Sequence, residues 1–233
     1  MLYRWIFLDA DNTLLDFDRA ERYALEGALA EAGYPYREDY LLEYHAINYA
    51  CWRAYEAGEL DRDRLRIVRF EQLLAHLGTH VERPLAMAQR LADAYMQRLS
   101  ETDFLIHEAI EILEALQGSA GLVMVTNGLS EVQWPRLRRS GLEPFFEQVV
   151  IADEIGVSKP HPDFFEQAFA HIGHPQPEEV LMVGDNLLAD IEGAQAYGMD
   201  TCWFNPGDVD NRSGIFPTYE IRALRELPRL LFG

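Results

Sequence analysis

The stretch Trp5-Ile-Phe-Leu-Asp9-Ala-Asp11-Asn-Thr13 decides the fold of this chain. It opens with a continuous apolar run, which is typical of a strand buried on both faces of a parallel sheet. Two aspartates follow, so the carboxylates of Asp9 and Asp11 stand just beyond the end of the strand. Open α/β sheets bind ligands at this place, and both carboxylates could project into one pocket. The same residues also fit a cap for the following helix, and the spacing alone leaves both interpretations open.

Further apolar runs end, like the first, in a polar residue. They cover residues 122–125, 149–151, 180–183 and 202–204. Segments with the helical period lie near residues 106–116, 132–137, 164–172 and 191–194. The second of these opens at Ser130, and Gln133 follows at capping-box spacing, so Ser130 is expected to cap that helix. Strands that alternate with helices predict an α/β fold with a Rossmann-like, doubly wound parallel sheet.

The alternation stops between residues 18 and 99, where four helical patterns and no strand are found. We therefore predict two domains. Residues 1–17 and 100–233 form the sheet core, and residues 18–99 form an inserted, all-helical subdomain. Its expected place is over the carboxyl ends of the strands. A turn-rich loop is expected at residues 205–217, and a closing helix near residues 221–231.

The composition is that of a globular protein with a strongly negative surface. The 233 residues are 48% hydrophobic, and 39 acidic residues stand against 20 basic ones, which gives a net charge of −19. Such a surface repels nucleic-acid phosphates and anionic lipids, so we expect no nucleic acid and no membrane as partner. The apolar run at residues 5–8 is too short for a signal peptide, and Cys51 and Cys202 are expected to be free thiols. We therefore expect a cytoplasmic protein.

Lys159 stands out because it is the only lysine among the 20 basic residues. A chain that uses arginine everywhere else has reason to keep a lysine where a compact ammonium is needed. Lys159 follows the third apolar run after a loop, so its charge could neutralise a phosphate or hold a carboxylate in place. An exposed surface lysine is the alternative interpretation.

The other strand ends carry groups suited to phosphate or to a metal ion. Thr126-Asn127-Gly128 offers a hydroxyl, an amide and backbone N–H groups, all of which suit phosphate oxygens. Asp185 and Asp190 follow the fourth apolar run and suit Mg²⁺, which prefers oxygen ligands. Each group taken alone also fits a plain turn or an N-cap. Because four strand ends bring these groups to one edge of the sheet, we favour a joint site.

This order of motifs resembles the haloacid dehalogenase-like hydrolase superfamily over the whole chain, including a helical cap inserted after the first motif. The resemblance implies that Asp9 is the nucleophile and Asp11 the general acid/base. It also implies Mg²⁺ held by Asp9, the main-chain carbonyl of Asp11 and Asp185, with Asp190 supporting from behind.

The resemblance also implies a phosphoryl-binding set. Thr126 and Lys159 would bind the transferring group, helped by the backbone of Asn127 and Gly128. Several stretches look like the bacterial pyrimidine-type 5′-nucleotidase branch, among them Ile151-Ala-Asp-Glu-Ile-Gly-Val-Ser-Lys-Pro160.

On this resemblance we expect a Mg²⁺-dependent phosphomonoesterase that works through an aspartyl-phosphate on nucleoside 5′-monophosphates such as UMP, dUMP or dTMP. Its partner would be a small phosphorylated metabolite, and the protein would be a monomer or a homodimer. Asn48 and Trp52 are the candidate substrate contacts in the cap. An acid at Asp11 favours phosphoryl transfer over halide displacement, because a departing alcohol needs a proton. The alternatives are a phosphoglycolate or sugar-phosphate phosphatase or phosphomutase, and a catalytically silent Mg²⁺-binding regulatory or receiver-like module.

Overall fold

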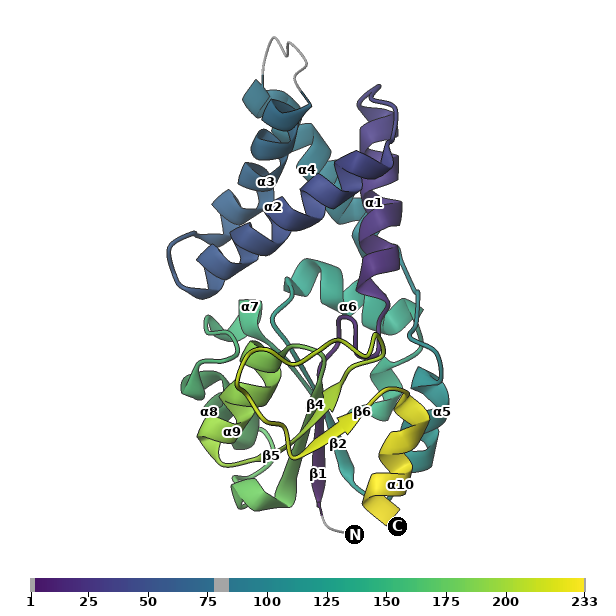
Figure 1. The fold of residues 1–233 in the computed structure, drawn as a ribbon, viewed down its shortest axis with the longest axis vertical. Helices are drawn as coiled ribbons and strands as arrows, with labels where there is room; N and C mark the ends of the chain where they lie inside the picture. Colours follow the sequence, from purple (N-terminus) through teal and green to yellow (C-terminus); the bar gives the residue numbers. More distant parts are fainter. Residues whose placement is uncertain (1–2, 78–83, 233) are drawn as a thin grey trace. The chain divides into compact units, whose positions relative to one another are not determined.

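The computed structural model describes residues 3–77 and 84–232 (Figure 1). The chain divides into two compact units, of which one comprises Met1–Phe17 and Asp103–Gly233 and the other Asp18–Thr102. The structure places the second boundary after Thr102, whereas the sequence placed it after Leu99. Parts of the predicted ranges 1–17, 18–99 and 100–233 lie outside the described residues.

The first unit is built on a six-stranded sheet in the order β3-β2-β1-β4-β5-β6, and every pair of neighbouring strands is parallel. The strands are β1 (Trp5–Leu8), β2 (Gly121–Thr126), β3 (Gln148–Ile151), β4 (Val180–Gly184), β5 (Asp200–Phe204) and β6 (Tyr219–Ile221). From β1 the chain adds β2 and β3 on one side, and then crosses to add β4, β5 and β6 on the other. Because the strand order reverses beside β1, a crevice is expected there, at the carboxyl ends of β1 and β4.

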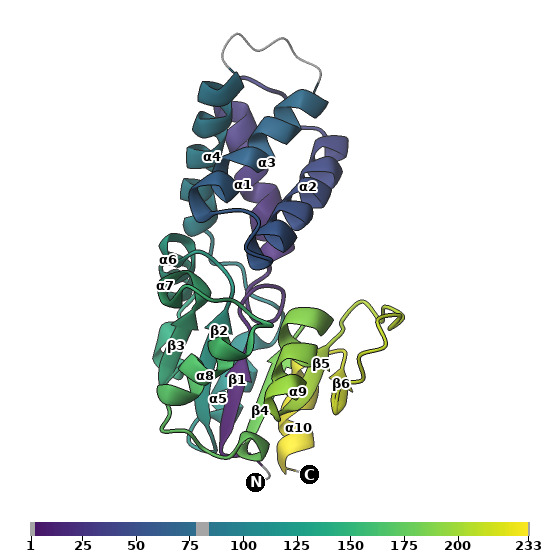
Figure 2. The same cartoon turned by 90° about the vertical axis from the view of Figure 1, so that its left-hand side faces the viewer.

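Helices cover both faces of the sheet (Figure 2). On one face α5 (Ala109–Leu116) and α10 (Leu227–Phe232) pack on Ile6 and Leu8. On the other, α8 (Pro162–Ala170) and α9 (Gly193–Tyr197) pack around Phe7. Successive residues of β1 thus point to opposite faces and both faces are buried, which explains the continuous apolar run. The remaining elements of this unit are α6 (Ser130–Arg139), α7 (Ala152–Ile155), η1 (Glu143–Phe145), η2 (Pro177–Glu179), η3 (Leu187–Glu192) and η4 (Leu224–Glu226).

Helices are the only regular elements among the described residues of the second unit. Its helices are α1 (Phe17–Glu31), which begins at the boundary, α2 (Glu38–Glu56), α3 (Arg62–His76) and α4 (Pro84–Ser100). Tyr44, Phe70 and Tyr95 form an aromatic cluster inside it, with ring centroids 5.1 to 5.4 Å apart. Among the described residues no helix combines the length and the apolar character that crossing a membrane requires.

The prediction of a doubly wound parallel sheet with an all-helical insertion is confirmed. Two local predictions were wrong. A short strand, β6, stands where the closing helix was expected to begin, and the helix proper is confined to α10. Ser130 does not cap α6, because its hydroxyl and its N–H both donate to Asp153 Oδ2, at 2.8 and 3.0 Å. The predicted partner in that cap, Gln133, is therefore free for other contacts.

Candidate active site

The candidate site is built around Asp9, which directly follows β1 at the reversal of strand order. Its N–H donates to the carbonyl of Val183 on β4 at 2.9 Å, so the parallel ladder holds the backbone of this residue. The side chain is buried, with only 7% of the residue exposed. A buried carboxylate needs partners, and a single cation supplies the closest one.

That cation is Lys159, whose ammonium lies in the interior with 1% of the residue exposed. Its three donors are all used: Nζ lies 2.6 Å from Asp9 Oδ1, 2.7 Å from Asp190 Oδ1 and 2.9 Å from the carbonyl oxygen of Val125. Although burial opposes it, the carboxylates of Asp190 and Asp9 raise the pKa of Lys159, so the side chain stays charged. Lys159 therefore binds two carboxylates in the interior, and the alternative interpretation as an exposed surface lysine is wrong.

Asp190 is held by the segment between β4 and α9. It lies in η3, a π-helical turn, and its Oδ2 accepts from the N–H of Asn186 at 3.0 Å while Oδ1 accepts from Lys159. The approach is close: a Cβ on Gly184 would stand 2.2 Å from Asp190 Oδ2. Glycine at the end of β4 is therefore what lets Asp190 reach Lys159. Both oxygens of Asp190 are engaged, which suits a supporting place behind the site.

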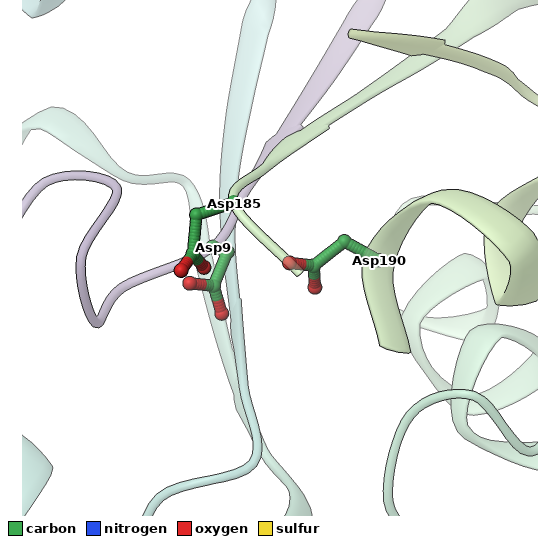
Figure 3. Close-up of side chains that lie close together, drawn as sticks. All are labelled: Asp9, Asp185 and Asp190. Carbon is green, nitrogen blue, oxygen red and sulfur yellow. The ribbon is translucent and has the colours of Figure 1, made fainter. Parts of the chain in front are cut away.

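Asp9, Asp185 and Asp190 form an acidic cluster, in which one carboxylate oxygen from each lies within 4.8 Å of the others. Figure 3 shows Asp9 and Asp185 at the strand ends and Asp190 pointing toward them from η3. Burial, reinforced by the charge of Asp190 and opposed by Lys159, raises the pKa of Asp9 to about 7. Burial also raises the pKa of Asp185 well above its usual range, and the charges of Asp9 and Asp190 add to this.

The acidic cluster fits a hard divalent cation. The atoms that it offers to a metal ion are carboxylate oxygens, which Mg²⁺ prefers. The cluster has three carboxylates and one neighbouring ammonium, which contacts two of them, so its negative charge is only partly balanced. The raised pKa values of Asp9 and Asp185 have burial as their main cause, and the charges of the other carboxylates in the cluster raise them further. The side chain of Asp11 is not part of this cluster.

Thr126, the last residue of β2, and Asn127, which follows it, also lie at this edge of the sheet. The side chain of Asn127 pairs with the backbone of Lys159, as its Nδ2 donates to the Lys159 carbonyl at 2.9 Å and its Oδ1 accepts from the Lys159 N–H at 2.8 Å. Thr126 is buried, and its Oγ1 accepts from the N–H of Gly128 at 3.1 Å. The structure therefore brings these predicted residues, Lys159 and Asp9 to one edge of the sheet.

Asp11 has two partners that the sequence analysis did not place in the site. Its Oδ1 accepts from Nη1 of Arg136 at 2.5 Å, and its Oδ2 accepts from Nε2 of Gln133 at 2.7 Å. Both partners are on α6 and both are buried, with 1% and 2% of the residue exposed. One signal could have pointed to them: two polar residues, spaced i and i+3, lie on the buried face of a helix between Val132 and Leu137.

The two residues predicted to touch substrate in the cap lie on α2. Asn48 is buried inside the helical unit, where its Nδ2 donates to Glu21 Oε1 and its Oδ1 accepts from Arg69 Nη1, both at 2.8 Å. In this structure its amide therefore belongs to a buried polar chain with Glu21 and Arg69. Trp52 is half-buried and packs edge-on against Tyr55, with ring centroids 5.6 Å apart.

Comparisons with known proteins agree with this geometry. The family model described as haloacid dehalogenase-like hydrolase matches residues 3–198. "Pyrimidine 5′-nucleotidase PynA" of Streptococcus pneumoniae is 34% identical, with 97% of this chain and 94% of the relative covered. "Pyrimidine 5′-nucleotidase YjjG" of Escherichia coli is 33% identical, with 99% of each chain covered.

A solved structure is similar over its full length. The crystal structure of the "putative HAD-hydrolase YfnB" from Bacillus subtilis, bound to magnesium, has a TM-score of 0.90 and 38% identity, and the match covers 100% of both chains. Structures of L-2-haloacid dehalogenase from Xanthobacter autotrophicus, 21–22% identical, share the fold at TM-scores of 0.77 and 0.78. On the family match and the nearly full-length relatives, the chain belongs to the haloacid dehalogenase-like hydrolase family.

Proposed function

We propose that this hydrolase is a Mg²⁺-dependent phosphomonoesterase that acts on nucleoside 5′-monophosphates with a pyrimidine base. The observation that carries the chemistry is the contact of the buried ammonium of Lys159 with the carboxylate of Asp9, within a cluster of three aspartates. A carboxylate that attacks a phosphate dianion must overcome charge repulsion, and a fixed cation beside it reduces that cost. The substrate class is supported by the names of the two nucleotidase relatives.

Asp9 is the nucleophile of the first step. Since Lys159 is bonded to Oδ1, we assign the attack on phosphorus to Oδ2. The new bond joins that oxygen to phosphorus while the bond from phosphorus to the ester oxygen breaks. The departing alkoxide takes a proton from the carboxyl group of Asp11, so the nucleoside leaves as a neutral alcohol.

Asp11 then reverses its role in the second step. Its carboxylate takes a proton from a water molecule whose oxygen attacks phosphorus, and the bond between phosphorus and Asp9 breaks. Inorganic phosphate leaves, Asp9 regains its carboxylate and Asp11 its proton. Lys159 contacts Asp9, and Thr126 lies at the end of the neighbouring strand β2; both would hold the phosphoryl oxygens in the two steps.

A Mg²⁺ ion would be held by the carboxylates of Asp9 and Asp185 and by the main-chain carbonyl of Asp11. When bound, it would offset the negative charge of the carboxylates and of the phosphoryl group. Magnesium in the related YfnB structure supports this assignment. Asp190, with both oxygens engaged, orients Lys159 and the main chain at Asn186.

Phosphate release from a panel of esters tests this proposal. The panel contains UMP, dUMP, dTMP, purine nucleotides, phosphoglycolate and sugar phosphates, each with and without Mg²⁺. We expect Mg²⁺-dependent turnover that is fastest with the pyrimidine nucleotides. Turnover confined to phosphoglycolate or sugar phosphates would refute the substrate class and keep the chemistry.

Asp9→Asn provides the test of the nucleophile, with Asp210→Asn as its matched control. Asp210 belongs to another Asp-x-Asp pair, which lies in the exposed loop before β6. It has the same local spacing but is not part of the site. We expect Asp9→Asn to abolish turnover and Asp210→Asn to retain it. Phosphate release by Asp9→Asn at the wild-type rate, or silence of the wild type on every ester, would overturn the phosphatase proposal.

A further inference from the structure

Gln133 on α6 joins the two sides of the candidate site. Its Nε2 lies 2.7 Å from Oδ2 of Asp11 and 3.0 Å from Oγ1 of Thr126. A primary amide nitrogen carries two hydrogens, so one can go to each oxygen. One buried side chain thus bonds both the proposed acid/base and the proposed phosphoryl-binding hydroxyl.

The orientation of the Gln133 amide follows from the chemistry of its neighbours. Arg136 can only donate hydrogen bonds, so the amide oxygen of Gln133 must face it and the NH₂ group faces Oδ2 of Asp11, which accepts at 2.7 Å. The amide oxygen faces Nη1 of Arg136, a pure donor, at 3.4 Å. Exchanging the amide oxygen and nitrogen would set oxygen against oxygen at Asp11 and nitrogen against nitrogen at Arg136.

This arrangement also sets the direction of the Thr126 hydroxyl. A hydroxyl oxygen accepts two hydrogen bonds and donates one. Both accepting positions of Thr126 Oγ1 are taken, by Nε2 of Gln133 and by the N–H of Gly128 at 3.1 Å. The hydroxyl group can therefore still donate its own proton, and a phosphoryl oxygen, which only accepts hydrogen bonds, needs such a donor.

Gly128 leaves the space through which Gln133 reaches the site. A Cβ at this position would stand 2.2 Å from Nε2 of Gln133 and 2.8 Å from its Cδ and Cγ. Such distances require the glutamine to move, so a side chain at position 128 and the present path of Gln133 exclude each other.

Arg136, one turn further along α6, holds the other oxygen of Asp11. Its guanidinium is buried beneath the ring of Phe17, whose centroid is 5.9 Å from Cζ. Among the described residues its Nε and Nη2 have no hydrogen-bond partner, so the contact to Asp11 is the strongest that this cation makes there. A buried cation bound in this way limits where the carboxylate of Asp11 can lie.

We infer that Gln133 and Arg136 are positioning residues of the reaction: Arg136 and Gln133 hold the Asp11 carboxyl, and Gln133 also holds the Thr126 hydroxyl as a donor. The inference rests on the proposed phosphatase function. The two residues are expected to have different effects. Of the two proposed reaction groups Asp11 and Thr126, Arg136 contacts only Asp11, whereas Gln133 contacts both.

Two esters with different leaving groups measure these effects separately. We compare kcat/KM for dUMP, or for the alkyl ester that the panel selects, with kcat/KM for 2,4-dinitrophenyl phosphate. Alkoxide departure needs the proton of Asp11, whereas dinitrophenolate leaves without one, and kcat/KM reports the first phosphoryl transfer in both cases. The two measured kcat/KM values fall in the same proportion when part of a variant is unfolded. Their ratio therefore does not change merely because a variant folds poorly.

Arg136→Met should lower kcat/KM for the alkyl ester by about 10²-fold and leave that for the dinitrophenyl ester nearly unchanged. Gln133→Met should lower both constants, by about tenfold for the dinitrophenyl ester and further for the alkyl ester. Gln133→Glu keeps the side-chain shape without the N–H donors and should behave like Gln133→Met. Arg138→Met, on the exposed side of the same helix, is the matched control and should leave the ratio at its wild-type value.

Three results would overturn the inference. Equal losses on both esters in Arg136→Met would show a purely structural role, and unchanged constants in the Gln133 variants would show no role in the reaction. A wild-type protein inert toward both esters would instead refute the proposed function, and the positioning roles would fall with it.

Discussion

Replacing Lys159 by methionine tests the charge arrangement of the site most directly. Methionine retains much of the length of the side chain and removes the ammonium, which contacts Asp9 at 2.6 Å and Asp190 at 2.7 Å. At an effective dielectric constant of about 20, each contact corresponds to about 6 kcal/mol of attraction. Desolvation of the buried ammonium cancels several kcal/mol of that sum. Removing one partner of a buried ion pair costs about 3–5 kcal/mol, and this is the loss in the free energy of unfolding that we expect for Lys159→Met.

Urea unfolding of the metal-free protein, followed by tryptophan fluorescence, measures that loss. Trp203 is a reporter close to the site, since its Nε1 donates to the main-chain carbonyl of Asp185 at 2.8 Å. The loss should be largest near about pH 8 and shrink toward about pH 5. Lys159 lowers the pKa of Asp9, so without it that pKa rises further, and protonation at low pH removes the unpaired charge.

The double variant Lys159→Met/Asp190→Asn serves as the control. It removes one of the two carboxylates left without the ammonium, so part of the lost stability should return. A loss below about 1 kcal/mol for Lys159→Met, the size of an exposed ion pair, would refute the reasoning. A loss that grows toward low pH would refute it as well.

Three further predictions concern other parts of the molecule. Gly184→Ala places a Cβ 2.2 Å from an oxygen of Asp190 and should cost about 1–3 kcal/mol in urea unfolding; unchanged stability would contradict the close approach. The affinity for Mg²⁺, measured by calorimetry, should rise with pH through the pKa of Asp9 at about 7, because burial raises the pKa of both Asp9 and Asp185 and their protons must leave before the metal ion binds; a flat profile would contradict this. The contact with Glu21 raises the pKa of His45, so the stability from this pair is present below the unfolded-state pKa of about 6.5 and is lost as the pH rises through the folded-state value. His45→Gln should remove that pH dependence from thermal melting, and a variant whose melting curves keep it would show that another group is responsible.

Much of the fold follows from local pattern. Five strands could be located because each is a short, continuous apolar run, as buried parallel strands require. The helices of the insertion were predicted from their period in the same way. β6 was missed because Tyr219-Glu-Ile221 is too short to show a period, and its pairing with β5 depends on a neighbour. The cap at Ser130 was wrong because Asp153, distant in sequence, provides a better acceptor for it than the helix end does.

The sequence by itself determined which chemical groups stand at the carboxyl ends of the strands: the aspartates, the threonine and the only lysine. Strand ends are defined by hydrophobic pattern, which is a local property, and a parallel sheet brings them to one edge. Only the tertiary structure decided which of these groups touch. Lys159 meets Asp9 across 150 positions of the chain, and Gln133 meets Asp11 across 122. Contacts of this kind depend on the order of the strands and on the placement of α6 on the sheet. Neither can be predicted from the hydrophobic pattern of a short stretch of sequence.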